Sequence, residues 1–320
     1  MTGRLLSDAD ILRARGPKNT VDPFRPYHFL VEPEYSADGA VEDVATVFLS
    51  NRECPFRCLM CDLWKNTTND RVPPGAIPTQ IELALASMPP ARHLKLYNSG
   101  NFFDPQAIPP ADLPQIAALS AGFRTVIVEN HPKLCSDRVP RFQQLLETQL
   151  EVALGLETSH EPTLRQLNKQ MTVQDFAQAC RFLTDHAVRI RTFILLKPPY
   201  TSDDEGIDRA VESVRFAFDC GAECCAVIPV RAGNGIMDEL QARQLFSPPK
   251  LSALETVLTE TLAWKRGRVF ADLWEARQFA DCSHCADQRT KRLHIANLTQ
   301  TMPAPVSCSF CQPDSVTHDA

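Results

Sequence analysis

Three closely spaced cysteines are the residues of this chain best suited to chemistry. They form a Cys-x3-Cys-x2-Cys array in the segment NRECPFRCLMCDLW: Cys54, Cys58 and Cys61. The array directly follows ATVFLS (45–50), an apolar run of strand length. Three thiolates on one loop can hold three irons of a [4Fe–4S] cube and leave the fourth iron open. Buried free cysteines are the alternative, but the intervening Pro55 and Arg57 make a poor core segment.

A second cysteine group lies near the C-terminus. It consists of two Cys-x2-Cys pairs: Cys282, Cys285, Cys308 and Cys311. Two such pairs can close a four-thiolate metal site. Because thiolates suit both zinc and iron–sulfur clusters, a structural zinc and an auxiliary [4Fe–4S] cluster both remain open. Four unrelated thiols are the third alternative.

Composition limits the class of protein. The chain has 320 residues, is 44% hydrophobic and carries 12 cysteines. The start of the chain, residues 1–16, is not followed by a long apolar stretch, so we expect a cytoplasmic protein without signal peptide or membrane span. Clustered cysteines then indicate metal binding or catalysis. The formal net charge of −6 provides no overall attraction to nucleic acid.

Predicted strands alternate with predicted helices through the middle of the chain. This order predicts parallel pairing, and six such units predict an α/β fold, a partial (β/α)6 TIM-type barrel with a C-terminal cysteine-rich metal-binding module. Chemistry in such barrels lies where the strands end. The expected strands are 45–50, 93–98, 124–129, 151–157, 189–197 and 223–230, and the expected helices are 77–88, 111–120, 139–150, 171–187 and 204–221. Thr172 is the expected N-cap of the fourth helix.

Several motifs at these strand ends narrow the prediction. They are LKLYNSGNFFDPQAIP, IVENHP, VALGLETSHEPTLRQLNKQ, FILLKPPYTSDDEGIDRAVESVRFA and PVRAGNG. Together with the three-cysteine loop, they resemble the radical S-adenosylmethionine (SAM) superfamily over roughly residues 45–260. The resemblance is to the radical SAM subunit of archaeosine synthase and to the related elongator catalytic subunit and methylthiotransferase branch.

The resemblance implies cofactors and a reaction. It implies a [4Fe–4S] cluster on Cys54, Cys58 and Cys61, with SAM chelated by the open iron. Reductive cleavage of SAM would then give a 5′-deoxyadenosyl radical that abstracts hydrogen from the substrate. In the archaeal enzymes the substrate is a lysine-modified deazaguanine in tRNA, and a C–N bond is broken. The resemblance also implies an electron donor, a reductase or a protein of flavodoxin or ferredoxin type.

Residues for binding SAM follow from the same resemblance. Asn98, Ser99 and Gly100 would meet the amino group of the methionyl moiety, with an ordinary polar turn as the alternative. Glu157 would accept the ribose hydroxyls, with a surface glutamate as the alternative. Met60 would pack near the adenine, although a methionine that fills a core gap is equally open. Glu129, Asn130 and His131 follow the third strand and either touch cofactor or substrate or cap a helix, and no catalytic residue is predicted.

The sequence predicts three structural units and leaves several functions open. We expect an extended N-terminal arm (1–44), a radical SAM barrel (45–260) and a four-cysteine module (261–320). Arg289, Lys291 and Arg292 offer a basic patch that meets phosphate or is simply solvated. The predicted function is radical SAM chemistry on a modified nucleoside in tRNA. A small metabolite or lipid-like substrate is the alternative, and a non-catalytic metal-binding adaptor for RNA or protein is the contrasting class.

Overall fold

The computed structural model describes residues 5–311 and contains an eight-stranded sheet in which strands β1 to β8 lie in chain order. β1 pairs antiparallel with β2, and all later neighbours pair in parallel. The strands are β1 (His28–Tyr35), β2 (Val41–Phe48), β3 (His93–Tyr97), β4 (Thr125–Asn130), β5 (Gln149–Glu157), β6 (Arg189–Leu196), β7 (Cys224–Pro229) and β8 (Arg268–Ala271). The sheet curls into a half barrel, which confirms the predicted partial barrel.

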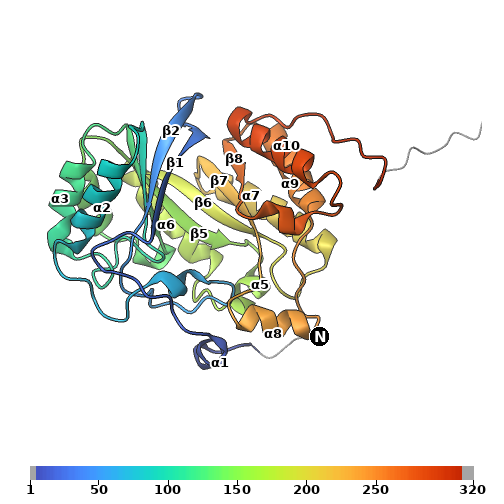
Figure 1. Ribbon diagram of the computed structural model, residues 1–320, viewed down its shortest axis with the longest axis horizontal. Coiled ribbons are helices and arrows are strands. Elements are labelled where there is room, and N and C mark those ends of the chain that lie inside the picture. Colours follow the sequence, from blue (N-terminus) through green and yellow to red (C-terminus); the bar gives the residue numbers. More distant parts are fainter. Residues whose placement is uncertain (1–4, 312–320) are drawn as a thin grey trace, which may run out of the picture.

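Helices cover the convex side of the sheet and close its ends (Figure 1). α2 lies beside β2 with α3 packed next to it, and α9 and α10 lie beside β8. The helices are α1 (Asp8–Ala14), α2 (Ala76–Ser87), α3 (Leu113–Leu119), α4 (Arg138–Leu145), α5 (Glu161–Gln166), α6 (Val173–Asp185), α7 (Asp203–Asp219), α8 (Ile236–Ala242), α9 (Leu251–Ala263) and α10 (Ala286–Thr299). No helix within residues 5–311 is long and apolar enough to cross a membrane.

Local sequence signals explain where the major helices begin. Thr172 caps α6 as predicted, and it forms a reciprocal capping box with Asp175. Ser202 and Glu205 form the same motif at the start of α7. The expected helix 139–150 is shorter, because α4 ends at Leu145 and β5 already begins at Gln149.

The N-terminal region differs from the extended arm expected for residues 1–44. It contains the capped helix α1, and β1 pairs with β2 along its full length. β1 carries Pro33, and a proline is tolerated there because β1 is an edge strand. The expected boundary at residue 44 therefore falls inside β2, and the boundary at 260 falls inside α9.

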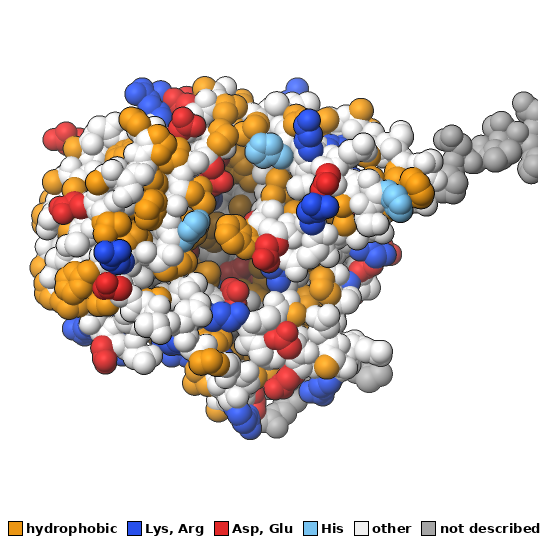
Figure 2. Space-filling view, viewed as in Figure 1, with side chains coloured by type: hydrophobic (Ala, Val, Ile, Leu, Met, Phe, Trp, Pro, Cys, Tyr) orange, Lys and Arg blue, Asp and Glu red, His pale blue; other side chains and the backbone are white. Residues whose placement is uncertain are grey.

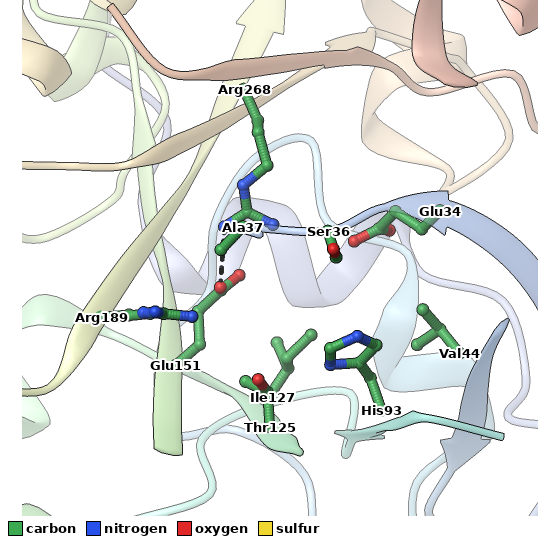
Figure 3. A pocket seen from close by; sticks show the side chains of 10 residues that line it. All are labelled: Glu34, Ser36, Ala37, Val44, His93, Thr125, Ile127, Glu151, Arg189 and Arg268. Atoms are coloured by element: carbon green, nitrogen blue, oxygen red, sulfur yellow. Dashed lines mark hydrogen bonds and ion pairs between the residues drawn. The ribbon is translucent and has the colours of Figure 1, made fainter. Parts of the chain in front are cut away.

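A buried charge network fills the barrel at the end where the parallel strands begin. Arg191 of β6 pairs with both Glu34 of β1 and Glu151 of β5, in each case over 2.6 Å. Glu151 also pairs with Arg268 of β8 over 2.9 Å, and Figure 3 shows these two side chains pointing at each other. The cavity beside them measures about 10 Å³, so this end of the barrel is closed to a substrate.

Candidate active site

The loop after β2 carries Cys54, Cys58 and Cys61 to the end of the barrel where the parallel strands finish. Asn234, which follows β7, donates from Nδ2 to the carbonyl oxygens of Leu59 (2.8 Å) and Cys61 (3.2 Å). Residues from opposite sides of the barrel therefore hold this loop. No local sequence pattern predicts this role of Asn234, because it depends on a contact across the barrel.

A cluster of cations anchors the start of the loop. Glu53 pairs with Arg15 (2.6 Å), Lys18 (2.8 Å) and Arg57 (3.3 Å). Burial disfavours its charge, but hydrogen bonds from Lys18 and Arg15 outweigh burial and lower the pKa of Glu53. The N-terminal segment thus fixes the residue directly before the first loop cysteine.

The three loop thiols lie near one another. Burial, with the neighbouring thiols, raises the pKa of Cys54 to about 11 and those of Cys58 and Cys61 to about 12. These values describe protonated thiols, and iron binding would release their protons because the thiolate is the metal ligand.

The Asn98–Ser99–Gly100 turn lies against the first of these cysteines. A Cβ built on Gly100 would lie 3.4 Å from the Cβ of Cys54. The side chain of Asn98 is fully buried, and both of its amide atoms lack a hydrogen-bond partner among the described residues. Buried polar groups without a hydrogen-bond partner are rare in folded proteins. The turn therefore fits a polar ligand placed beside the cysteine loop.

Asn101 links this turn to the loop. Its Nδ2 donates to Cys54 Sγ over 3.1 Å, and its Oδ1 accepts the backbone N–H of His131 over 2.7 Å. The NSGN sequence contains a polar residue at this place, but only the fold shows that its side chain reaches a sulfur.

Glu129 supports the turn from β4. Its Oε1 accepts the backbone N–H of Asn98 (2.6 Å) and of Gly100 (3.3 Å). Burial raises the pKa of Glu129 to about 7, against the opposing effect of these N–H groups. Glu129 thus shapes the turn at the edge of the open barrel.

His131 has a structural role. Its ring stacks on Phe56 of the cysteine loop at 3.8 Å between centroids, and its Nε2 donates to the carbonyl oxygen of Lys169 over 3.0 Å. Its Nδ1 accepts from the backbone of Lys133, which fixes the neutral tautomer. Burial accordingly lowers the pKa of His131 to about 3.

Glu157 is buried where β5 ends and pairs with buried Lys169 over 2.6 Å. A Cβ on Gly155 would lie 2.4 Å from Glu157 Oε1 and 2.5 Å from Lys169 Nζ, so a larger residue there would have to displace the pair. Burial disfavours the ammonium, but the Glu157 carboxylate outweighs burial and raises the pKa of Lys169. Glu157 is therefore no surface glutamate. Lys169 was not predicted as a site residue, because a lysine is normally exposed.

Met60 packs against a small apolar cluster at the mouth of the barrel, which is separate from the main hydrophobic core. Helices α1 and α8 contribute Ile11 and Ile236 to this cluster, and β6 contributes Leu195. The cluster shields one side of the cysteine loop from water.

The inside of the half barrel is open above the charge network. Inward-facing strand residues Phe48, Tyr97, Phe193 and Ile228 remain partly exposed while their outward neighbours are buried. The ring of Tyr97 contacts Phe48 (6.2 Å) and Phe193 (6.1 Å) edge to face. Figure 2 shows the viewed face of the molecule hollowed near its centre, with hydrophobic, charged and histidine side chains around the hollow. The arrangement provides an aromatic-lined chamber.

The expected basic patch near the C-terminus is wrong for two of its three residues. Arg289 and Arg292 are buried and both pair with Glu255, so they do not form a solvated patch for phosphate. Lys197, directly after β6, is also buried and bonds to Asp203 and Ser247. Arg289 and Arg292 meet Glu255 of α9, a different helix, which a linear pattern does not reveal.

The tail cysteines come together as predicted. The sulfurs of Cys282, Cys285, Cys308 and Cys311 all lie within 4.8 Å of one another. They form a compact candidate metal site beside α10.

Comparisons with known proteins agree with this geometry. No protein-family model matches the chain. The chain is 26% identical to archaeosine synthase subunit beta of Methanosarcina acetivorans, over 86% of this chain and 84% of that protein. A radical SAM methyltransferase from Sphaerobacter thermophilus superposes with a TM-score of 0.51 at 14% identity, covering 78% of this chain and 77% of the other. Elp3 of Methanocaldococcus infernus superposes with a TM-score of 0.50 at 14% identity, covering 69% and 58%.

The chain therefore has the fold of radical SAM enzymes. It is a distant homologue of archaeosine synthase subunit beta.

Proposed function

We propose that this chain is a radical SAM enzyme whose Cys54, Cys58 and Cys61 hold a [4Fe–4S] cluster with SAM on its open iron. The observation that carries the proposal is the buried, unpartnered amide of Asn98 in a turn that touches Cys54. An amide oxygen accepts from an ammonium, so this turn suits the amino group of SAM. When bound there, the reduced cluster would supply the electron that cleaves SAM to a 5′-deoxyadenosyl radical, which abstracts hydrogen from the substrate.

The chain's own residues bind and orient the cofactor. Asn98, Ser99 and Gly100 receive the amino group, and Glu129 keeps their backbone in place. Glu157 accepts the ribose hydroxyls; its pair with Lys169 is compatible with this role, because a carboxylate accepts several hydrogen bonds at once. Met60 and its apolar neighbours cover the adenine and exclude water.

Anaerobic reconstitution tests the cofactor assignment. With a reductant and SAM, the protein should release 5′-deoxyadenosine, and its paramagnetic resonance spectrum should shift when SAM is added. Replacing Cys54, Cys58 and Cys61 together by Ala should abolish both signals. Cys220→Ala, at the end of α7 and outside both cysteine groups, is the matched control. A triple variant that keeps the SAM-dependent spectrum would refute the assignment.

For the substrate we propose a modified nucleoside in tRNA. The distant homology to an archaeosine synthase subunit supports this class, and the aromatic chamber suits a planar ring. An electron donor of flavodoxin or ferredoxin type would reduce the cluster. tRNA binding by the reconstituted protein should weaken steeply as salt rises. Replacing exposed Lys291 by Ala should reduce the salt slope by about one.

A small metabolite is the second candidate substrate. The burial of Arg289 and Arg292 favours it, because these residues provide no surface for a phosphate backbone. Undetectable or salt-independent tRNA binding would select this candidate. Release of 5′-deoxyadenosine should survive either outcome, since it depends only on the cysteine loop.

A further inference from the structure

The spacing of the tail sulfurs discriminates between the two metal centres that four cysteines can hold. All four sulfurs lie within 4.8 Å of one another, and Cys285 Sγ lies 3.7 Å from Cys311 Sγ. Four thiolates around one zinc ion at about 2.3 Å form a tetrahedron with edges of about 3.8 Å. The observed spacing is that of a single ion. We propose that Cys282, Cys285, Cys308 and Cys311 bind one zinc ion rather than an auxiliary iron–sulfur cluster.

A [4Fe–4S] cube would need a wider arrangement. Each of its thiolates binds a different iron and points away from a different corner of the cube, so the sulfurs stand farther apart than ligands of one ion. The loop cysteines give an internal comparison. Within residues 5–311, Cys54, Cys58 and Cys61 do not form a set as tight as the tail cysteines.

Arg289 supplies a second, independent observation. Cys285 is buried at the N-cap of α10, and Arg289, one turn later, donates its backbone N–H to the Cys285 carbonyl oxygen over 3.0 Å. The Nε of Arg289 is buried without a partner among the described residues. Zinc with four thiolates carries a net charge of 2−, so a buried cation that donates N–H to a thiolate would stabilise it. The pair with Glu255 keeps the guanidinium in place.

The contacts around the site show what the ion would hold. His284 of the first cysteine pair stacks on Phe310 of the second, with centroids 3.7 Å apart and an interplanar angle of 7°. Asp281, just before the site, accepts from Ser252 at the start of α9 over 2.7 Å. After α10 the chain runs to Cys311 without helix or strand. The zinc would therefore fasten this irregular segment to α9 and α10, as structural zinc sites do.

Metal analysis of the protein purified under anaerobic conditions tests the inference. The chain reconstituted with iron should contain one zinc and four irons. The variant with Cys54, Cys58 and Cys61 replaced by Ala should keep the zinc and lose the iron, which isolates the tail site from the loop. Replacing half-buried Cys308 by Ala should remove the zinc and leave four irons, whereas Cys220→Ala should change neither. Iron without zinc in the loop variant, whether as a cluster or a single ion, would overturn the proposal.

Hydrogen exchange tests the fastening role. Removing zinc with a chelator, or introducing Cys308→Ala, should increase exchange in α10 and in residues 300–311 by at least about tenfold and leave β3 to β6 unchanged. Unchanged exchange in α10 and residues 300–311 would show that the ion does not hold the segment. Metal analysis and hydrogen exchange do not depend on SAM cleavage. Their outcome therefore tests the zinc site separately from the proposed enzyme activity.

Discussion

Asn101 donates a hydrogen bond from Nδ2 to Cys54 Sγ over 3.1 Å. This bond joins the loop after β2 to the turn after β3. Hydrogen bonds to cluster sulfurs favour the reduced, more negative state of the cluster. Asn101→Ala should therefore lower the cluster's reduction potential. A neutral bond worth about 1 kcal/mol corresponds to roughly 40 mV for one electron.

A redox titration followed by paramagnetic resonance measures this shift. Asn19→Ala, which removes an exposed amide that bonds to Asn66, is the matched control and should leave the potential unchanged. An unchanged or higher potential in Asn101→Ala would contradict the assigned role.

Gly100 offers a test of whether the Asn98–Ser99–Gly100 turn binds SAM. Adding a side chain there crowds Cys54 and the space beside it, so Gly100→Val should retain cluster iron but weaken the SAM-dependent spectral shift. We expect at least about tenfold weaker SAM binding, or about 1.4 kcal/mol. Gly16→Val is the control, because a Cβ on Gly16 meets nothing within 4 Å. Equal SAM affinity in both variants would show that the Asn98–Ser99–Gly100 turn does not bind SAM.

The buried pair of Lys169 and Glu157 should be sensitive to single substitutions. Lys169→Met leaves an uncompensated carboxylate in the interior and should reduce the free energy of unfolding by about 3–5 kcal/mol. The double variant Lys169→Met with Glu157→Gln should recover most of this loss. Denaturant titration of the three proteins measures the effect, and a double variant no more stable than Lys169→Met would contradict the pairing.

The charge network at the closed end of the barrel predicts a pH dependence. Burial disfavours the Glu151 carboxylate, but Arg191 and Arg268 outweigh burial and lower the pKa of Glu151 to about 2. A carboxyl group whose folded pKa lies below its unfolded value stabilises the protein above the unfolded pKa. That contribution, about 3 kcal/mol, is lost as the pH falls from about 4.5 to 2.

Glu151→Gln isolates this contribution. The wild type should lose stability more steeply than the variant over that pH range, because the other acid-sensitive groups are common to both. At neutral pH the variant should be less stable, since Arg191 and Arg268 lose their shared carboxylate. Parallel stability profiles would show that Glu151 is not ionised in the network.

The six central strands and the cysteine loop were predicted from sequence because their signals are local. Apolar runs of strand length alternate with amphipathic helices, and Thr172 with Asp175 forms a recognisable helix start. β1 was missed, since Pro33 and its charged neighbours obscure an edge strand whose partner is needed to define it.

The polar contacts of the site were decided by tertiary structure. Asn101 reaches Cys54 and Lys169 reaches Glu157 only after the strands align their ends. Arg289 is basic in the sequence but buried in the fold, because Glu255 of α9 meets it there. Residue type and spacing alone indicate which residues could bind iron, SAM and a second metal. Burial and charge pairing depend on segments far apart in the chain, so only packing decided which cations pair internally and how closely the tail sulfurs approach.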